Sequence, residues 1–167
     1  LHLTNRNAAG AVLSFFNYTY YRRGRRDSMA TKEGQWTYRY DDLGRLTNAV
    51  FASTNQGVPS QDLSYAYDAL GNRRWTIENG VRRDYQPNAL NQYVTAGATQ
   101  FHYDADGNLT NEVAGAEVTH YLFNDENRLI GVRRGAEAWD YTYDPLGTRV
   151  ATTDNGVTTH YLVDQIG

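Results

Sequence analysis

Residues 141–149 read Tyr-Thr-Tyr-Asp-Pro-Leu-Gly-Thr-Arg, and this short segment predicts the turn of a β-hairpin. Side chains alternate along a strand, so Tyr141 and Tyr143 lie on one face. Asp144 can accept backbone N–H groups two residues on, and the proline after it supplies the φ angle that a type I turn needs. Gly147 then stands where a left-handed residue closes such a turn with a bulge.

The same spacing recurs eight times along the 167 residues of the chain. A Gly or an Asn stands at each anchor position, namely Gly24, Gly44, Gly71, Asn91, Gly107, Asn127, Gly147 and Gly167. An aromatic residue stands six positions before each anchor, namely Tyr18, Tyr38, Tyr65, Tyr85, Phe101, Tyr121, Tyr141 and Tyr161. Successive anchors are 20, 27, 20, 16, 20, 20 and 20 residues apart. A nearly fixed period of this length indicates a repeat fold in which each unit is stabilised by its neighbours.

An acidic residue three positions before the anchor is the second shared feature. It is found in five repeats as Asp41, Asp68, Asp104, Asp144 and Asp164, while Asn takes its place in two others and Tyr21 in the first. Carboxylates can serve as general acids and bases. One aspartate per turn in a repeating array instead favours a role in the turn itself.

A second turn follows most anchors by eight to ten residues. Its markers are Gly34, Asn79-Gly80, Gly115, Gly135 and Asn155-Gly156. We therefore predict an all-β fold, a curled strip of consecutive antiparallel β-hairpins with about two strands in each ~20-residue repeat and a buried aromatic face. Residues 1–167 are expected to form a single array of about eight repeats, cut from a longer one. Residues 1–17 are expected to be a less regular start, and residues 48–64 a loop insertion.

Composition and charge narrow the function classes. The net charge is −3, there is no cysteine, and no apolar run approaches the length of a membrane span. The most basic stretch, residues 22–26, falls at a turn and is interpreted as solvated charge. Beyond short pairs of arginines the chain has no block of like charge, so its sequence does not predict binding to nucleic acid.

Residues that could carry chemistry are scattered. The four histidines lie in distant repeats, so they do not form a metal site, and no nucleophile or phosphate-loop motif occurs. We expect no catalytic, cofactor-binding or metal-binding residues, and no enzyme activity. Trp36, Trp75 and Trp139 are predicted to be packing residues; the alternative is that they stack on sugars.

Five segments carry a resemblance to the RHS/YD-repeat family: residues 40–46, 67–73, 103–109, 123–129 and 143–149, of which the first reads Tyr-Asp-Asp-Leu-Gly-Arg-Leu. The resemblance covers essentially the whole chain. It implies a hollow β-shell that, in bacterial RHS and toxin-complex proteins, encloses a C-terminal toxic polypeptide. In the animal teneurins a related shell serves adhesion at the cell surface.

Two functional hypotheses follow. In the first, the chain is a non-catalytic segment of a bacterial shell, secreted or at the cell surface, whose partners are the remainder of its shell and an enclosed C-terminal toxin or effector. In the second, it is a surface module that binds carbohydrate through exposed aromatic residues. Open sheet edges also predict self-association.

Overall fold

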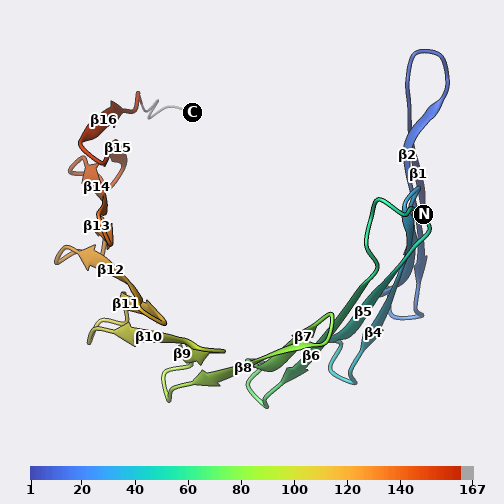
Figure 1. Cartoon of the computed structure of the whole chain (residues 1–167), viewed down its shortest axis with the longest axis horizontal. Helices are drawn as coiled ribbons and strands as arrows, with labels where there is room; N and C mark the ends of the chain where they lie inside the picture. Colours follow the sequence, from blue (N-terminus) through green and yellow to red (C-terminus); the bar gives the residue numbers. More distant parts are fainter. Residues whose placement is uncertain (163–167) are drawn as a thin grey trace. The chain divides into compact units, whose positions relative to one another are not determined.

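The computed structural model describes residues 1–162, and these contain sixteen β-strands and no helix (Figure 1). They divide into two compact units, Leu1–Tyr85 and Gln86–Gly167. The strands of the first unit are β1 (His2–Arg6), β2 (Val12–Tyr20), β3 (Arg26–Ala30), β4 (Gly34–Tyr40), β5 (Leu46–Ser53), β6 (Gln61–Tyr67), β7 (Arg73–Glu78) and β8 (Val81–Pro87), whose last two residues belong to the second. Those of the second are β9 (Tyr93–Ala96), β10 (Thr99–Tyr103), β11 (Leu109–Ala114), β12 (Glu117–Phe123), β13 (Leu129–Arg134), β14 (Glu137–Tyr143), β15 (Arg149–Asp154) and β16 (Val157–His160).

Within each unit, every strand pairs antiparallel with the strands that precede and follow it in the sequence. The predicted all-β fold of consecutive antiparallel hairpins, with about two strands per repeat, is confirmed. Between two anchors that are 20 residues apart lie two strands, one that leaves the first anchor and one that leads to the second. The sixteen-residue interval is shorter because β9 has only four residues.

The two faces of the sheet differ as the alternation requires. In β4 the side chains of Trp36, Tyr38 and Tyr40 are half-buried, while the three residues between them and after Gly34 are exposed. Among residues 1–162 the buried apolar side chains are only Ala49, Phe51, Ala96 and Ala151. The aromatic face was expected to be buried, but it is only half-buried. In a single sheet layer, its rings are covered only by neighbouring side chains on the same face.

Two segments are more regular than the sequence suggests. Residues 1–17, expected to be the least regular part, contain β1 and most of β2, which pair with one shift of register between Asn5 and Arg6. Of residues 48–64, expected to be a loop insertion, only 54–60 lie outside strands. The alternation of half-buried and buried residues continues through Ala49 and Phe51, so β5 extends into this segment.

Candidate functional site: the turn edge

The repeated feature of the structure is the turn that contains the anchor. The backbone φ is positive at all seven described anchors, from 59° at Asn127 to 93° at Gly71; Gly167 lies outside the described residues. In the turn of Gly44, the anchor N–H donates to the Asp41 carbonyl at 2.9 Å, and the Asp41 N–H donates to the Arg45 carbonyl at 3.0 Å. These two bonds close a four-residue loop that only a left-handed residue can complete.

The residue three before the anchor serves this turn through its side chain. Asp68 Oδ1 accepts the Leu70 N–H at 2.9 Å and the Asn72 N–H at 2.8 Å, and Oδ2 accepts the Asn72 amide at 3.0 Å. The Asn72 amide, with the backbone N–H groups, lowers the pKa of the Asp68 carboxyl. The carboxylate is therefore held ionised as a hydrogen-bond acceptor, which is a poor state for a general acid.

Two repeats build the same turn with an amide oxygen in place of a carboxylate. Asn88 Oδ1 accepts the N–H groups of Leu90 and Gln92 at 2.9 and 3.0 Å. Asn124 Oδ1 does the same for Glu126 and Arg128 at 3.1 and 3.0 Å. Because Asn replaces Asp without loss of these bonds, the turn needs an acceptor at this position and not a titratable acid.

A β-bulge follows each of six turns, always at the residue three after the anchor. In the hairpin β4–β5, for example, Tyr40 pairs with Leu46 and Arg39 pairs with Asn48, so Thr47 is the extra residue. The extra residues are Asp27, Thr47, Arg74, Thr110, Ile130 and Val150. Such a bulge increases the local twist and interrupts the ladder of backbone hydrogen bonds.

The backbone pairing of one hairpin with the next ends several residues before the turn. In the unpaired stretch between that point and the turn, tyrosine hydroxyls donate hydrogen bonds to the neighbouring strand. Between β5 and β6 the last pair on this side is Asn48 with Ser64. Beyond it, the Tyr67 hydroxyl of β6 donates to the Leu46 carbonyl of β5 at 2.8 Å. Tyr67 stands four before its anchor and Leu46 stands two after the previous one, so the bond joins consecutive repeats.

The same bond occurs twice in the second unit. The Tyr103 hydroxyl donates to the Tyr93 carbonyl at 2.9 Å, and the Tyr143 hydroxyl donates to the Leu129 carbonyl at 2.8 Å. In each case the donor stands four before one anchor and the acceptor two after the preceding anchor. Phe123 occupies the donor position in β12 and has no hydroxyl to give. The tyrosine of the repeat is thus a link between hairpins, in addition to its apolar contact.

Polar side chains placed one after the anchor make a second set of links along the turn edge. Arg45 Nη1 donates to the Asp68 carbonyl at 2.8 Å, and Arg25 Nη1 donates to the Asp41 carbonyl at 3.3 Å. In the second unit, Gln92 Nε2 donates to the Gly107 carbonyl at 3.1 Å. Each of these side chains reaches from one turn to the next. Consecutive repeats are therefore linked by two kinds of hydrogen bond, one from a tyrosine hydroxyl and one from the side chain after the anchor.

The residues of the predicted aromatic ladder lie on the even-numbered strands. Tyr18, Tyr38, Tyr65, Tyr85, Phe101, Tyr121 and Tyr141 are half-buried, whereas Tyr161 follows β16 and is exposed. Arginines cover several of the rings: the Arg149 guanidinium lies 4.1 Å from the Tyr141 ring centroid, and that of Arg26 lies 5.0 Å from Tyr18. These contacts add a cation–π attraction to the packing.

The three tryptophans have neighbours against their rings. Trp36 stacks on Phe51 with ring centroids 5.1 Å apart. Trp139 has the Arg134 guanidinium 5.6 Å from its ring, and Trp75 has that of Arg82 at 5.1 Å. Trp36 and Trp139 share the face of the ladder, but Trp75 pairs with Ala66 and therefore lies on the opposite face from Tyr65.

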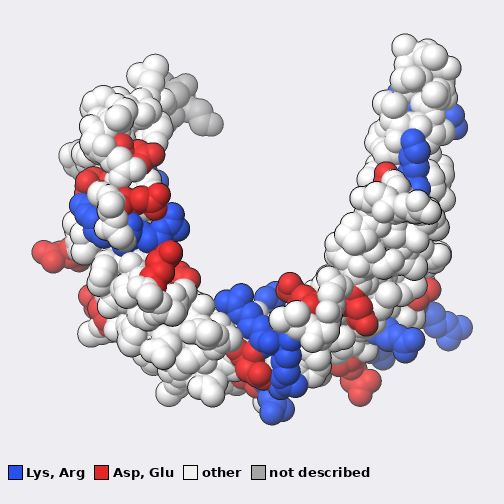
Figure 2. All heavy atoms as spheres, in the orientation of Figure 1, with Lys and Arg blue, Asp and Glu red and all other residues white. Residues whose placement is uncertain are grey.

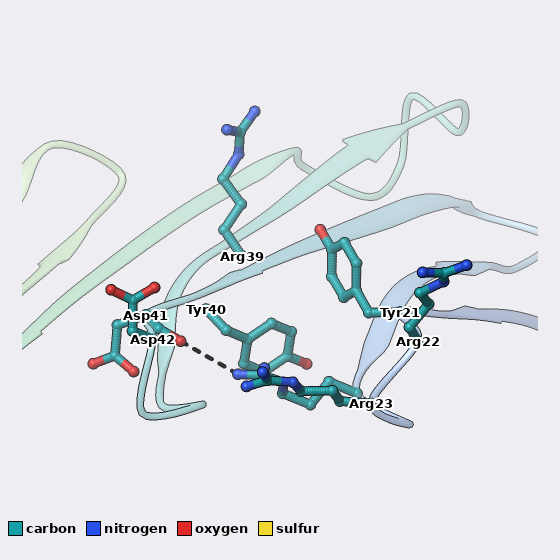
Figure 3. A pocket seen from close by; sticks show the side chains of 8 residues that line it. Tyr21, Arg22, Arg23, Arg39, Tyr40, Asp41 and Asp42 are labelled. Carbon is teal, nitrogen blue, oxygen red and sulfur yellow. Dashed lines mark hydrogen bonds between the residues drawn. The ribbon is translucent and has the colours of Figure 1, made fainter.

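The first repeat departs from the pattern and forms an open hollow of about 830 Å³ in the first unit. Tyr21 replaces the usual Asp, and its hydroxyl donates to the Tyr38 carbonyl at 3.1 Å. The rings of Tyr21 and Tyr40 meet edge to face at 6.2 Å. The lining side chains come from the turn after β2, from the end of β4 and from the turn after β4 (Figure 3); they are Tyr21, Arg22, Arg23, Arg25, Arg39, Tyr40, Asp41 and Asp42.

The described residues hold no group of three or more His, Asp or Glu side chains that could bind a metal ion. They likewise include no helix with the length and apolar character needed to span a membrane. Within residues 1–162, the arrangement that repeats is one of turns, bulges and links between hairpins.

Comparison with known proteins gives the family of this repeat. The family model described as the teneurin YD-shell matches residues 16–156. The chain belongs to the teneurin YD-shell family. The resemblance to RHS/YD-repeat proteins is thereby confirmed, and the turn with its anchor, acceptor and tyrosine is the repeating unit of a YD shell.

Two curated relatives of this YD-shell chain are toxins or nucleases by name. It is 30% identical over 126 residues to the double-stranded DNA deaminase toxin A of Burkholderia cenocepacia, covering 72% of this chain and 8% of that protein. It is 29% identical over 128 residues to the tRNA nuclease WapA of Bacillus subtilis, covering 72% and 5%. The chain spans less than a tenth of either relative.

Solved structures share the fold of the YD shell. The crystal structure of TcdB2-TccC3-Cdc42 matches with a TM-score of 0.63 at 13% identity, over 92% of this chain and 10% of that one. The structure of the Photorhabdus luminescens Tc holotoxin pore matches with a TM-score of 0.52 at 15% identity, over 92% and 12%. This likeness concerns the fold of the chain.

Proposed function

We propose that this chain is a wall segment of a bacterial YD shell that encloses a C-terminal toxin or secreted effector, and that the segment itself is not catalytic. The observation that carries the proposal is the match of the YD-shell family over residues 16–156, the span in which turn, bulge and inter-hairpin links recur. The partners would be the rest of the shell and the enclosed polypeptide.

The names of the two relatives support a division of labour. One is a double-stranded DNA deaminase toxin and the other a tRNA nuclease, yet both are similar to this chain over about the same length. A segment shared by proteins of different chemistry is not expected to hold the catalytic groups of either, since function resides in sites and not in folds. We infer that the chemistry of such proteins lies outside the shared segment.

The carbohydrate-binding alternative has weaker support. A sugar-stacking platform needs an open aromatic face, and each tryptophan already has one neighbour in contact: Phe51 on Trp36, Arg82 on Trp75 and Arg134 on Trp139. All three side chains are half-buried. The shell proposal explains these contacts as packing within the sheet.

Enclosure is tested in the complete protein that contains this segment. We expect limited proteolysis to leave its C-terminal polypeptide intact while the shell is folded, and secretion or surface exposure in cell fractionation. Gly107→Val, which strains an anchor with φ of +87°, should open the wall and expose that polypeptide, whereas Asp106→Ala next to it should not. Enclosure would be overturned if the C-terminal polypeptide were digested as fast in the native protein as in the Gly107→Val variant.

The absence of catalysis is tested on the segment by itself. The purified chain should neither deaminate double-stranded DNA nor cleave tRNA. Product formation that survives purification to homogeneity, and is lost with a single substitution at the turn edge, would overturn the structural assignment.

A further inference from the structure

The hollow of the first unit carries positive charge that the fold does not use. Arg22, Arg23 and Arg39 make no hydrogen bond or ion pair within residues 1–162, and Arg22 and Arg23 are exposed. Arg25 is engaged, because it donates to the Asp41 carbonyl and lies over the Tyr40 ring at 5.4 Å. All four arginines line the hollow, and the turn that holds Arg22, Arg23 and Arg25 has Tyr21 where the other repeats have Asp or Asn.

The acids that line the hollow compensate only part of this charge. Asp41 is already paired with Arg45 at 2.7 Å. Asp42 has no such partner among the described residues, so the lining holds three unpaired arginines and one unpaired aspartate. Arginine presents a planar fork that matches a carboxylate in two parallel hydrogen bonds. The hollow is therefore suited to a ligand with discrete carboxylates.

The corresponding turn in the second unit has the opposite charge. Between β12 and β13 the turn reads Asn124-Asp125-Glu126-Asn127, with both acids exposed. Asp125 has no hydrogen bond or ion pair within residues 1–162, and Glu126 meets only Arg128, at 3.0 Å. Figure 2 shows acidic side chains projecting at this end of β12 and basic ones projecting at the turn ends of the first strands.

We propose that the basic hollow is a docking site for an acidic YD turn, specifically the turn of Asp125 and Glu126 presented by another copy of this chain. A hairpin turn is convex and the hollow is concave and open, and their unpaired charges are complementary. The two aspartates of the hollow disfavour a continuous polyanion such as nucleic acid, which would bring phosphates against both. A turn offers two carboxylates and then the basic Arg128.

The test is sedimentation of the purified chain at about 0.05 M and about 1 M salt. Exposed charge pairs are screened at high salt, so we expect concentration-dependent association at the lower salt only. The double variant Arg22→Glu, Arg23→Glu should weaken association about tenfold or more, and so should Asp125→Arg, Glu126→Arg. Arg74→Glu makes the same kind of charge change at an exposed arginine of β7 and should have no effect.

Mixing the two double variants gives the decisive result. In each double variant alone, the hollow and the docking turn carry charge of the same sign. In the mixture, the acidic turn of one variant can meet the basic hollow of the other, and the basic turn can meet the acidic hollow, so association should return. The proposal is overturned if either double variant alone associates as strongly as the native chain. It is also overturned if the mixture of the two fails to associate. So does binding of a labelled DNA duplex that Arg22→Glu, Arg23→Glu abolishes without any self-association, which would assign the hollow to nucleic acid. Circular dichroism of each variant verifies folding.

Discussion

Replacing Tyr67 by Phe removes one hydroxyl and leaves the ring, and it should destabilise the first unit by about 1 kcal/mol. The hydroxyl donates to the Leu46 carbonyl at 2.8 Å, beyond the point where the pairing of β5 and β6 ends. A neutral hydrogen bond contributes about 0.5–1.5 kcal/mol net. The middle of this range applies, since the bond is part-buried and water can reach the carbonyl in part.

Tyr65→Phe is the matched control. Tyr65 lies on the same strand and the same face, two residues earlier and half-buried like Tyr67, but its hydroxyl makes no hydrogen bond within residues 1–162. Its loss should change the free energy of unfolding by less than about 0.5 kcal/mol. Urea denaturation followed by far-ultraviolet circular dichroism measures both, and hydrogen exchange of β5 and β6 amides localises the effect.

The reverse substitution tests the same link from the other side. Phe123 stands four before its anchor, and the pairing of β11 with β12 ends at Asn111 and His120, as it does in the repeats that have the bond. Phe123→Tyr should supply a donor to the Leu109 carbonyl and raise the melting temperature by about 2–4 °C. Equal costs for Tyr67→Phe and Tyr65→Phe, with no gain from Phe123→Tyr, would refute the role of the hydroxyl.

Three further predictions concern the turns. Gly34→Ala should cost about 3 kcal/mol, because its Cβ would lie 2.3 Å from the Ala52 carbonyl oxygen; Gly80→Ala, with open space around it, should cost about 1 kcal/mol, and equal denaturation midpoints would contradict this. Gly107→Val should cost about 2–3 kcal/mol because of its positive φ, and Asp106→Ala less than about 0.5 kcal/mol; equal tolerance in thermal unfolding would show that the turn is misassigned. The amides of Asn72 and Asn108 lower the pKa of Asp68 and Asp104 below the usual 3.8, so their stabilising effect is present above that pH and disappears as the pH falls through the lowered values. Asp68→Asn with Asp104→Asn, which copies Asn88 and Asn124, should reduce this acid sensitivity; an unchanged pH profile of the urea midpoint would argue against it.

The local features of the fold could be predicted from the sequence, because turn chemistry is local. The spacing of Tyr143, Asp144 and Gly147 lies within five residues, and these residues encode the turn of the hairpin. The sequence predicts a bulge at the anchor itself, but it does not predict the extra residue three positions after the anchor. The extra residue is Thr47 in one repeat, Arg74 in another and Ile130 in a third, and these share no chemistry that a pattern could reveal.

The bulge also limits what counting along the chain can tell about faces. Trp75 stands four after an anchor, and an extra residue at Arg74 changes the side of the sheet to which the next residue points. The tyrosine links escape the sequence for a different reason. Their partners are 21, 10 and 14 residues away, and a carbonyl acceptor leaves no mark on residue identity.

The spacing of the repeat can now be understood as one physical unit. An anchor with positive φ and a side-chain acceptor close the turn, the bulge after it twists the returning strand, and the twist separates that strand from the next hairpin. In three repeats a tyrosine four before the next anchor, namely Tyr67, Tyr103 or Tyr143, bridges the separation. Pro87 occupies this position in the fourth repeat and cannot donate, and the chain divides into its two units beside it, between Tyr85 and Gln86. The tyrosine hydroxyl is therefore expected to strengthen the contact between consecutive hairpins, which the gain at Phe123 would measure directly.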